Sequence, residues 1–489
     1  MGQGKVNVPW RIETYGIDVV PDAERHGRPI DLFWIWFAAN IGILAIPYGT
    51  IILSFGLNFF QGLAVAIIGV LFSFMLVGAF SVAGRDAGAP MFTLSRAVFG
   101  LRGNFFPNFV SWISMVGWES IAVILGTLAM MSLIGTYWHL ATVPLGLISM
   151  VIVAGLVIVV GLLGQATLVI VQTWASYVFG ALTLIVAVLL IPRTNWSQLV
   201  NQPAGPWLDG FVPALSIVMA GTGLSWANAA ADYSRHTQKK YSAASVFWSA
   251  TLGGAIPLLV LIVVGLFFAT KEPQLGSASN PIALIQSALP AWMAVPYLLT
   301  AVAGLVVEAD LSLYSSGLDL LNLGVPLERY KTVGIDAVIM LAATTYVVLI
   351  AQNFFSPFES FLLLLGVGLA AWEGIFLADQ LFIRRRVGDY LSPVLYDRHA
   401  TQGLTRQGWN VPAVAGWFVG VVLGLLTTVS PWFSGPWAVG VFASSSLELA
   451  VAFFGAAAVF LAWSLVALRQ RRAGPAGRAL RTTPGSTGA

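Results

Sequence analysis

Residues 33–54 read FWIWFAANIGILAIPYGTIILS, an apolar stretch without a charged side chain. Its length matches the hydrocarbon core of a bilayer, which roughly 20 apolar residues cross as a helix. The stretch is interrupted at Asn40-Ile41-Gly42 and again at Pro47-Tyr48-Gly49. Because glycine and proline weaken helices, the pattern predicts a membrane-spanning helix that is broken near its middle.

Similar apolar blocks recur along the chain, in which 58% of residues are hydrophobic and only 9% are charged. The bilayer core offers no water to the backbone, so each block should be helical, and the blocks do not alternate as barrel strands would. We therefore expect an all-α polytopic membrane protein with 12 transmembrane helices. They lie near 33–54, 62–83, 106–133, 143–163, 167–191, 211–231, 243–269, 292–317, 333–352, 357–380, 411–429 and 447–468.

The sixth block carries a matching interruption, Gly221-Thr222-Gly223 followed by Trp226-Ala227-Asn228. Helices 1 and 6 open two five-helix halves, and paired breaks of this kind indicate an inverted-repeat transporter with a site at the midplane. Packing is the alternative use of such glycines. The expected organisation is two five-helix repeats at 33–191 and 192–380, a cytoplasmic loop at 381–410, and helices 11 and 12 within 411–468.

The basic residues predict the orientation. With the N-terminus in the cytoplasm, every Lys and Arg except Arg193 and Lys271 falls in a cytoplasmic segment. Both termini should therefore be cytoplasmic in a multi-pass protein of the cytoplasmic membrane. The polar N-terminal segment 1–32 and the tail 469–489 should be solvent-exposed, and no cleavable signal peptide is expected.

Several function classes are disfavoured by composition. The chain has no cysteine, and its histidines, His26, His139, His236 and His399, lie in loops or at span ends. We therefore expect no cofactor and no dedicated metal centre, and an intramembrane enzyme would lack a nucleophile–base pair or metal ligands. The basic pI suits loops beside an anionic leaflet, so we expect a lipid bilayer and no nucleic acid as partner.

Four acidic residues lie inside apolar blocks: Glu119, Glu308, Asp310 and Glu373. A charge in the bilayer is costly and usually functional, so these residues favour a transporter. For Glu373, which follows Trp372, a structural and a functional role remain open.

Further motifs appear in order along the predicted spans. They are Gly84-Arg85-Asp86-Ala87-Gly88-Ala89-Pro90-Met91, Gly117-Trp118, Trp226 with Ala231-Asp232-Tyr233, Leu313-Tyr314-Ser315-Ser316-Gly317-Leu318, and Ala378-Asp379-Gln380 with Arg384. Together they resemble the nucleobase:cation symporter-1 family, which includes purine–cytosine permeases. The resemblance covers roughly residues 30 to 390. It implies the leucine-transporter-like fold, a 5+5 inverted repeat with two C-terminal helices, and uptake of a nucleobase or related heterocycle driven by Na⁺ or H⁺.

In that family a tryptophan of helix 3 and one of helix 6 hold the planar ring, and Trp118 and Trp226 occupy those positions here. Stacking suits this role, because a base on an aromatic side chain gains roughly 1–3 kcal/mol. Relatives also read the edge of the base with amides where this chain has Ala122 and Ser312. The expected substrate-binding residues are therefore Trp118, Trp226, Glu308, Ser312, Asn40 and Glu119.

The missing amides leave the substrate open. A carboxylate acceptor suits a base with an amidine-like edge, such as cytosine or guanine. Allantoin, a hydantoin or a thiamine-like pyrimidine remains the alternative within the same family.

Helix geometry separates the acids of helix 8. Residues four apart share a face, so Glu308 lies with Ser312 and Asp310 lies with Val306 on roughly the opposite side. Sodium-coupled relatives place hydroxyls at the positions of Val306 and Val307, whereas valine offers a cation only its backbone carbonyl. Asp310 is the predicted ion-coupling residue, and burial favours the protonated form of a carboxyl. We favour H⁺, and a weak Na⁺ site near Asp310 and Val306 stays open.

Overall fold

The computed structural model describes residues 8–13, 15–351, 355–387, 390, 393–401 and 403–473. Over these ranges the chain is helical, with isolated β-bridges and no strand. The predicted cytoplasmic tail beyond residue 473 and the basic residue Lys5 lie outside the described residues.

The first predicted repeat contains seven helices. They are α1 (Pro29–Asn40), α2 (Ala45–Ser54), α3 (Phe59–Ala87), α4 (Met91–Phe99), α5 (Phe105–Gly135), α6 (Thr142–Gly161) and α7 (Gln165–Leu190). The first family motif, residues 84–91, runs from the end of α3 to the first residue of α4. This short helix is strongly amphipathic in sequence and almost wholly buried, so it packs into the protein and does not cross a membrane.

The second predicted repeat begins with a segment in four pieces, the π-helix η3 (Trp207–Phe211), α9 (Val212–Ala220), α10 (Gly223–Ala227) and α11 (Ala230–Ser234). The long helices that follow are α12 (Ala243–Phe268), α14 (Ala291–Asn322), α15 (Arg329–Thr345) with η5 (Tyr346–Ala351), and α16 (Phe355–Ala378) with η6 (Asp379–Ile383) and α17 (Arg384–Val387). Two more, α18 (Val411–Thr427) and α19 (Glu448–Ala473), complete the bundle.

The connections between these helices contain short helical turns. They are η1 (Asp22–Glu24), η2 (Ile191–Arg193), α8 (Trp196–Asn201), η4 (Pro273–Ser277), α13 (Pro281–Ala288), η7 (Pro393–Leu395) and η8 (Gly440–Ala443). Asparagine side chains cap the N-termini of α8 and α13, where Asn195 and Asn280 accept a hydrogen bond from the backbone N–H three residues further along.

Every predicted span coincides with a helix, although the count of twelve is not confirmed. Within the described ranges, ten helices are long and apolar enough to cross a membrane, and the bent pair α1–α2 would be an eleventh. The remaining candidate, α18, has 17 residues and is shorter. Both predicted breaks are present: α1 and α2 meet at 61°, and α9 ends just before Gly221.

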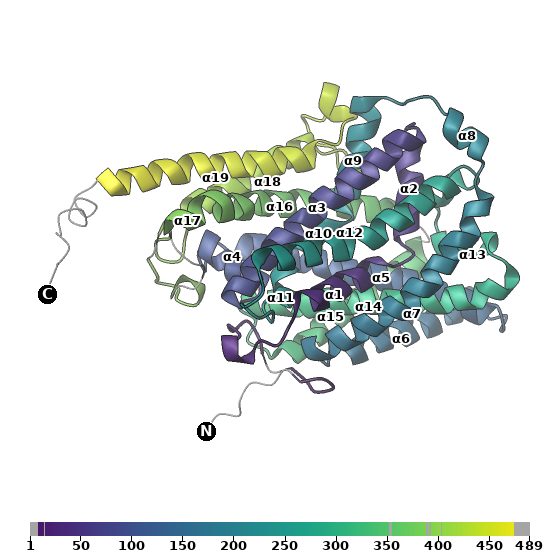
Figure 1. Cartoon of the computed structure of the whole chain (residues 1–489), viewed down its shortest axis with the longest axis horizontal. Coiled ribbons are helices and arrows are strands. Elements are labelled where there is room, and N and C mark those ends of the chain that lie inside the picture. The colour runs from purple at the N-terminus through teal and green to yellow at the C-terminus, as the bar shows by residue number, and fades with distance from the viewer. Residues whose placement is uncertain are drawn as a thin grey trace.

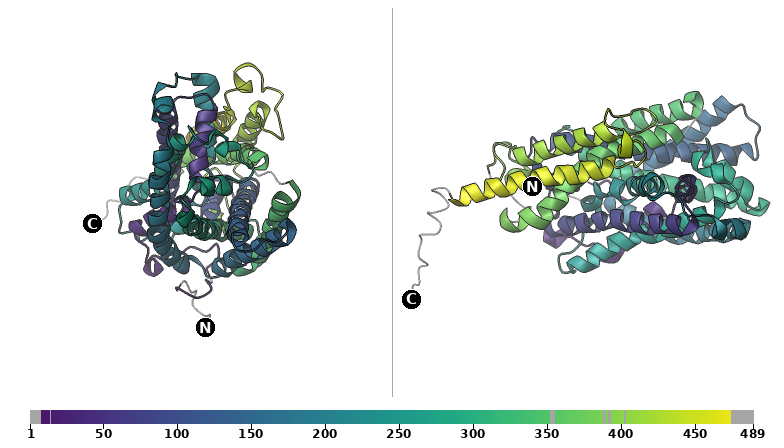
Figure 2. Two further views of the ribbon diagram at one scale, coloured as in Figure 1. Left: turned by 90° about the vertical axis from the view of Figure 1, so that its right-hand side faces the viewer. Right: turned by 90° about the horizontal axis from the view of Figure 1, so that it is seen from above.

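The long helices run side by side, and Figure 1 shows them along the horizontal axis. We call the end that holds α4 the α4 end, and the opposite end, which holds α13, the α13 end. Helices α18 and α19 pack on each other and on α16 along one flank, and the end-on view in Figure 2 shows the other helices gathered around a central group. The broken helices α1–α2 and α9–α11 lie inside this arrangement.

Candidate functional site

The breaks of the two interrupted helices meet in the interior. The hydroxyl of Tyr48, at the start of α2, donates a hydrogen bond to the carbonyl oxygen of Gly221 over 3.1 Å. A side chain at position 221 would collide with the Tyr48 hydroxyl, so this approach requires glycine. Sequence reasoning noted the Pro47-Tyr48-Gly49 interruption but missed Tyr48 as a residue of the site.

A small cavity of about 20 Å³ lies at this junction, with room for about one water molecule. Four of the six predicted substrate-binding residues line it, namely Asn40, Trp118, Trp226 and Glu308. The other lining residues are Ala39, Gly42, Leu44, Ala45, Tyr48, Gly221 and Leu258. The structure therefore brings together side chains from α1, α5, α10 and α14, far apart in sequence.

Both indoles of the cavity are held by other rings. The ring of Trp226 lies 5.6 Å from that of Trp36, at an interplanar angle of 69°. Trp118 meets Phe358 and Phe361 of α16 edge-on, at 6.2 and 5.8 Å. Edge-to-face contacts at these distances stabilise aromatic pairs, so the two indoles are preoriented. The buried Nε1 of Trp118 has no hydrogen-bond partner within the described part of the chain, so its N–H remains available to a ligand.

The carboxylate of the cavity belongs to Glu308, whose side chain is only 7% exposed. Its Oε2 lies 3.4 Å from where a Cβ on Gly42 would stand, which places it at the break that precedes α2. The amide nitrogen of Asn40 already donates to the carbonyl oxygen of Trp36 over 2.8 Å.

Glu119 and Ser312 are not among the residues that line the cavity, although both are fully buried. The side-chain oxygens of both lack a hydrogen-bond partner among the described residues. Glu119 is exposed electrostatically to two other carboxyl groups, those of Asp336 and Asp310.

Asp310 is fully buried, and its Oδ1 lies 3.6 Å from the position of a Cβ on Gly161 at the end of α6. It does not line the central cavity. Neither of its oxygens finds a hydrogen-bond partner in the described ranges. Nearby, the carbonyl oxygen of Val307 accepts the side-chain amide of Gln172 over 3.0 Å. Val307 packs with Ala38 and Ala175, so apolar groups and an amide occupy this face of α14.

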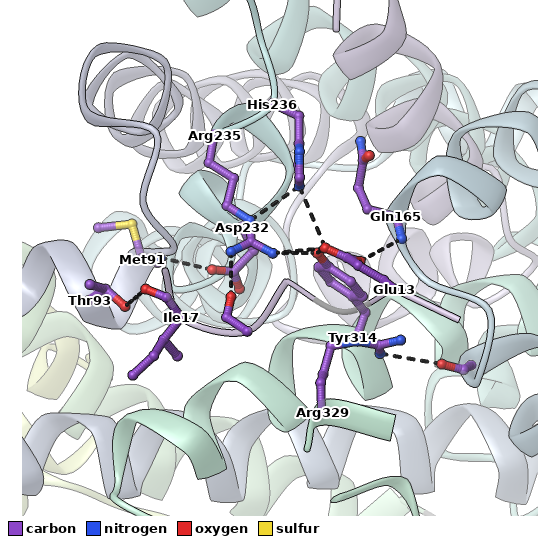
Figure 3. A network of polar contacts seen from close by, with 12 residues as sticks. Glu13, Ile17, Met91, Thr93, Gln165, Asp232, Arg235, His236, Tyr314 and Arg329 are labelled. Carbon is purple, nitrogen blue, oxygen red and sulfur yellow. Dashed lines mark hydrogen bonds and ion pairs between the residues drawn. The ribbon is translucent and has the colours of Figure 1, made fainter. Parts of the chain in front are cut away.

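A polar network lies at the α4 end (Figure 3). Its centre is Glu13 of the N-terminal segment, which is 2% exposed, so the expectation that this segment is solvent-exposed is wrong at Glu13. Its carboxylate accepts from Arg235 Nη2 at 3.2 Å, from the Tyr314 hydroxyl at 3.3 Å and from the backbone N–H of Gln165 at 3.0 Å. We call Glu13, Gln165, Arg235, His236 and Tyr314 the Glu13 network.

His236 and Arg235 make further contacts within the Glu13 network. Burial, followed by the charges of Arg235 and Arg25, lowers the pKa of His236 well below its ordinary value. The imidazole is therefore neutral, and its Nε2 accepts from Arg235 Nε over 3.2 Å. Arg235 also donates to the carbonyl oxygen of Gly16 and to the Tyr314 hydroxyl.

Asp232 does not form an ion pair with the nearby Arg235. Arg235 pairs with Glu13, and the Oδ1 of Asp232 accepts the backbone N–H of Met91 over 2.8 Å. Met91 is the first residue of α4, so Asp232 caps that helix. Asp379 does form an ion pair, with Arg384 at 2.8 Å. Sequence reasoning missed Glu13, since a single acid in a polar segment forms no pattern.

Glu373 lies in α16 and is fully buried. Its two carboxyl oxygens have no hydrogen-bond partner among the residues described. The preceding Trp372 donates its indole N–H to Ser95 over 2.9 Å. Neither residue lines the central cavity.

Comparisons with known proteins agree with this architecture. The family of permeases for cytosine/purines, uracil, thiamine and allantoin matches residues 19–452. The putative purine-cytosine permease YxlA of Bacillus subtilis is 28% identical over 402 residues, which cover 80% of this chain and 84% of that protein. The purine-cytosine permease FCY2 of Saccharomyces cerevisiae is 24% identical over 398 residues, covering 77% and 72%.

Among solved structures, the nucleobase-cation-symport-1 transporter Mhp1, in a closed conformation with bromovinylhydantoin bound, superimposes with a TM-score of 0.73. It is 18% identical, and the match covers 92% of this chain and 95% of Mhp1. A Na⁺-coupled sialic acid symporter shares the fold with a TM-score of 0.54 at 10% identity, covering 89% and 95%. This chain belongs to the family of permeases for cytosine/purines, uracil, thiamine and allantoin, and it is a multi-pass membrane transporter of leucine-transporter-like fold, not an enzyme.

Proposed function

We propose that this protein is a secondary-active, cation-coupled uptake permease for a nucleobase of the cytosine or purine type. The observation that carries the proposal is the cavity where the two broken helices meet, with the indoles of Trp118 and Trp226 and the carboxylate of Glu308 in its wall. A planar heterocycle needs aromatic faces above and below it and polar groups at its edge, and this wall offers both kinds.

The edge of the substrate would meet the carboxyl group of Glu308. A carboxylate accepts hydrogen bonds and donates none when ionised, so it favours a ring with adjacent N–H groups. A substrate lacking them would leave Glu308 buried and unpaired, at a cost of roughly 1–3 kcal/mol or more. An ionised Glu308 therefore suits guanine, whose ring N–H and exocyclic N–H₂ are adjacent, and it would accept a single hydrogen bond from the exocyclic N–H₂ of cytosine.

We infer alternating access around this cavity. At about 20 Å³ the cavity is too small for a base, so a wall has to move before a substrate fits. Toward the α13 end it adjoins a second small cavity through Leu44 and Tyr48, where Phe358 forms part of the wall. Toward the α4 end lies the Glu13 network, which we expect to separate when that end opens. Opening at either end would expose the same site.

H⁺ is the favoured coupling ion, with Asp310 as its carrier. Val306 and Val307 provide no side-chain oxygen, and the Val307 carbonyl is already occupied by Gln172. A hard cation such as Na⁺ needs several oxygen ligands, whereas a proton needs one carboxyl. We place the protein in the cytoplasmic membrane with the α4 end and both termini on the cytoplasmic side.

A permease for a hydantoin, allantoin or a thiamine-like pyrimidine is the second candidate. The structural relative Mhp1 was solved with bromovinylhydantoin bound, and such rings are also flat and rich in N–H groups.

Uptake of radiolabelled heterocycles into a permease-deficient cell tests the proposal. We expect saturable uptake of one nucleobase, with unlabelled cytosine, guanine, adenine, uracil, hydantoin and allantoin as competitors. Competition by hydantoin or allantoin but by no nucleobase would favour the second candidate. An inserted protein that takes up none of these heterocycles would contradict both.

A further inference from the structure

A second and much larger cavity, of about 490 Å³, lies outside the central site. It is enclosed by α5, by α15 with η5, and by the first half of α16, with Trp432 of the α18–α19 connection at its rim. Val116, Ile121, Ala343 and Leu364 are typical of its lining. None of the residues of the central cavity belongs to it.

The walls of this cavity offer a water molecule few hydrogen-bond partners. Besides Tyr346 at the rim, the lining hydroxyls are those of Ser120 and Ser360, and Ser120 already donates to the carbonyl oxygen of Val116 over 2.7 Å. The indole N–H of Trp112 donates to Asp336 over 3.1 Å. A buried water needs two to four polar partners, so water does not fill this space.

The mouth of the cavity opens on the face of the protein that contacts lipid. Ile339 and Tyr346 line the cavity and are 38% and 53% exposed. They belong to one outward stripe of α15 and η5 that also includes Ile335, Val338 and Ile350. In a membrane-spanning helix, such a stripe of exposed apolar side chains faces the hydrocarbon chains of the bilayer. The cavity is therefore continuous with the lipid-facing surface.

We propose that an acyl chain of a bilayer lipid occupies this cavity. An apolar cavity of roughly 150 Å³ is enough to bind benzene, and this one is larger. Close-packed interiors do not leave such a volume empty. Hydrocarbon chains are the neighbouring phase that matches its walls and reaches its mouth.

The acyl chain would lie directly behind the central site. Phe358 and Phe361 form part of the cavity wall, and the same two rings meet Trp118 edge-on. An acyl chain in the cavity thus supports the aromatic layer that orients the Trp118 indole. This consequence for substrate binding rests on the proposed function, whereas the lipid site itself does not.

The test uses the full-length protein in vesicles of phosphatidylcholine that carries a diazirine on one acyl chain. After photolysis, labelled residues are located by mass spectrometry of peptides. We expect labels on Val116 and Ile121, which are only 4% and 7% exposed and so are out of reach of lipid on the outer surface.

Two neighbouring alanines of α15 provide a matched pair. Ala343 lines the cavity, and Ala342 is exposed and is not among its lining residues. Ala343→Phe fills the space, so the labels on Val116 and Ile121 should be lost, whereas Ala342→Phe should retain them. If Ala343→Phe fails to insert, Ile339→Trp at the mouth replaces it, with the exposed Val338→Trp as its control.

Labels confined to outward residues such as Val338 in the wild-type protein would overturn the proposal. So would labels on Val116 and Ile121 that persist when the cavity is filled. A second copy of the chain over the mouth would also overturn it. In that case Ile339 would remain unlabelled, and a cysteine placed there would form a disulfide between two protomers of this naturally cysteine-free chain.

Discussion

The carboxylate of Glu13 and the guanidinium of Arg235 lie 3.2 Å apart, although 222 residues separate them in sequence. Both side chains are buried, at 2% and 0% exposure. The pair joins the segment before α1 to the chain that follows α11, and Tyr314 connects it to α14. We expect opening at the α4 end to separate these groups.

Glu13→Gln should therefore favour the state that is open at the α4 end. The substitution removes one charge of a buried pair, and breaking such a pair destabilises the arrangement by roughly 3–5 kcal/mol. Because the chain has no native cysteine, a single Ser315→Cys reports access. Ser315 is 1% exposed and contacts the Tyr233 hydroxyl over 3.1 Å. We expect faster labelling by a maleimide added from the α4 side.

Glu328→Gln is the control for this experiment, since Glu328 also forms an ion pair, with Lys331, but on an exposed surface. Exposed pairs contribute little, so labelling of Ser315→Cys should not change there. Equal labelling rates in the Glu13→Gln and Glu328→Gln backgrounds would show that the Glu13 network does not restrict access.

The distribution of Lys and Arg predicts that both termini are cytoplasmic. A reporter fused at residue 480 and one inserted in the loop 270–291 should report opposite sides of the membrane. The same side for both would contradict the predicted orientation and the even number of spans.

Asp310→Asn should abolish accumulation of the substrate against a gradient but leave binding and exchange measurable. The amide cannot take up or release a proton, and Asp310 does not line the central cavity. In the wild-type protein, uptake should rise as external pH falls, collapse with a protonophore and persist when choline replaces Na⁺. Sodium-dependent uptake that survives the protonophore and loses its Na⁺ stimulation in Asp310→Asn would assign the site to sodium.

Glu308→Gln should instead change affinity and the order in which heterocycles compete. The amide retains one acceptor and gains donors, so bases with carbonyl edges should improve relative to bases with N–H edges. Competition assays with the wild-type protein as reference measure this order. Glu119→Gln is the informative comparison, because Glu119 lies outside the cavity and should leave the order intact. If the heterocycles compete in the same order in the wild-type protein and in Glu308→Gln, Glu308 does not contact the edge of the substrate.

Much of this fold follows from sequence pattern alone. The spans follow from apolar length, and the breaks at Asn40-Ile41-Gly42 and Gly221-Thr222-Gly223 follow from local helix weakness. Because both breaks lie at corresponding positions of two repeats, their meeting in the interior was also predictable. The residues next to them, Asn40 and Trp226, accordingly line the cavity.

The residues of the candidate site were harder to predict, because they depend on the direction of each side chain around its helix. Glu119 follows Trp118 directly and points about 100° away from it around α5, and Glu119 is not among the residues that line the cavity. Ser312 shares the face of Glu308 but lies about 6 Å further along the axis, beyond the cavity. Glu13 depends on tertiary contacts with residues more than two hundred positions away, for which the sequence contains no local signal.

The stacking of a heterocycle between Trp118 and Trp226 is the central claim, and equilibrium binding to the purified protein tests it most directly. The ligand is the radiolabelled heterocycle that the uptake panel selects. Trp118→Ala and Trp226→Ala should each weaken binding by about fivefold to a hundredfold, since a stacking face contributes roughly 1–3 kcal/mol and about 1.4 kcal/mol is a factor of ten. Phenylalanine should be milder at both positions, and Trp292→Ala, at a residue 64% exposed, should bind like wild type. Wild-type affinity in both cavity alanine variants, each correctly inserted, would contradict the account and place the site elsewhere.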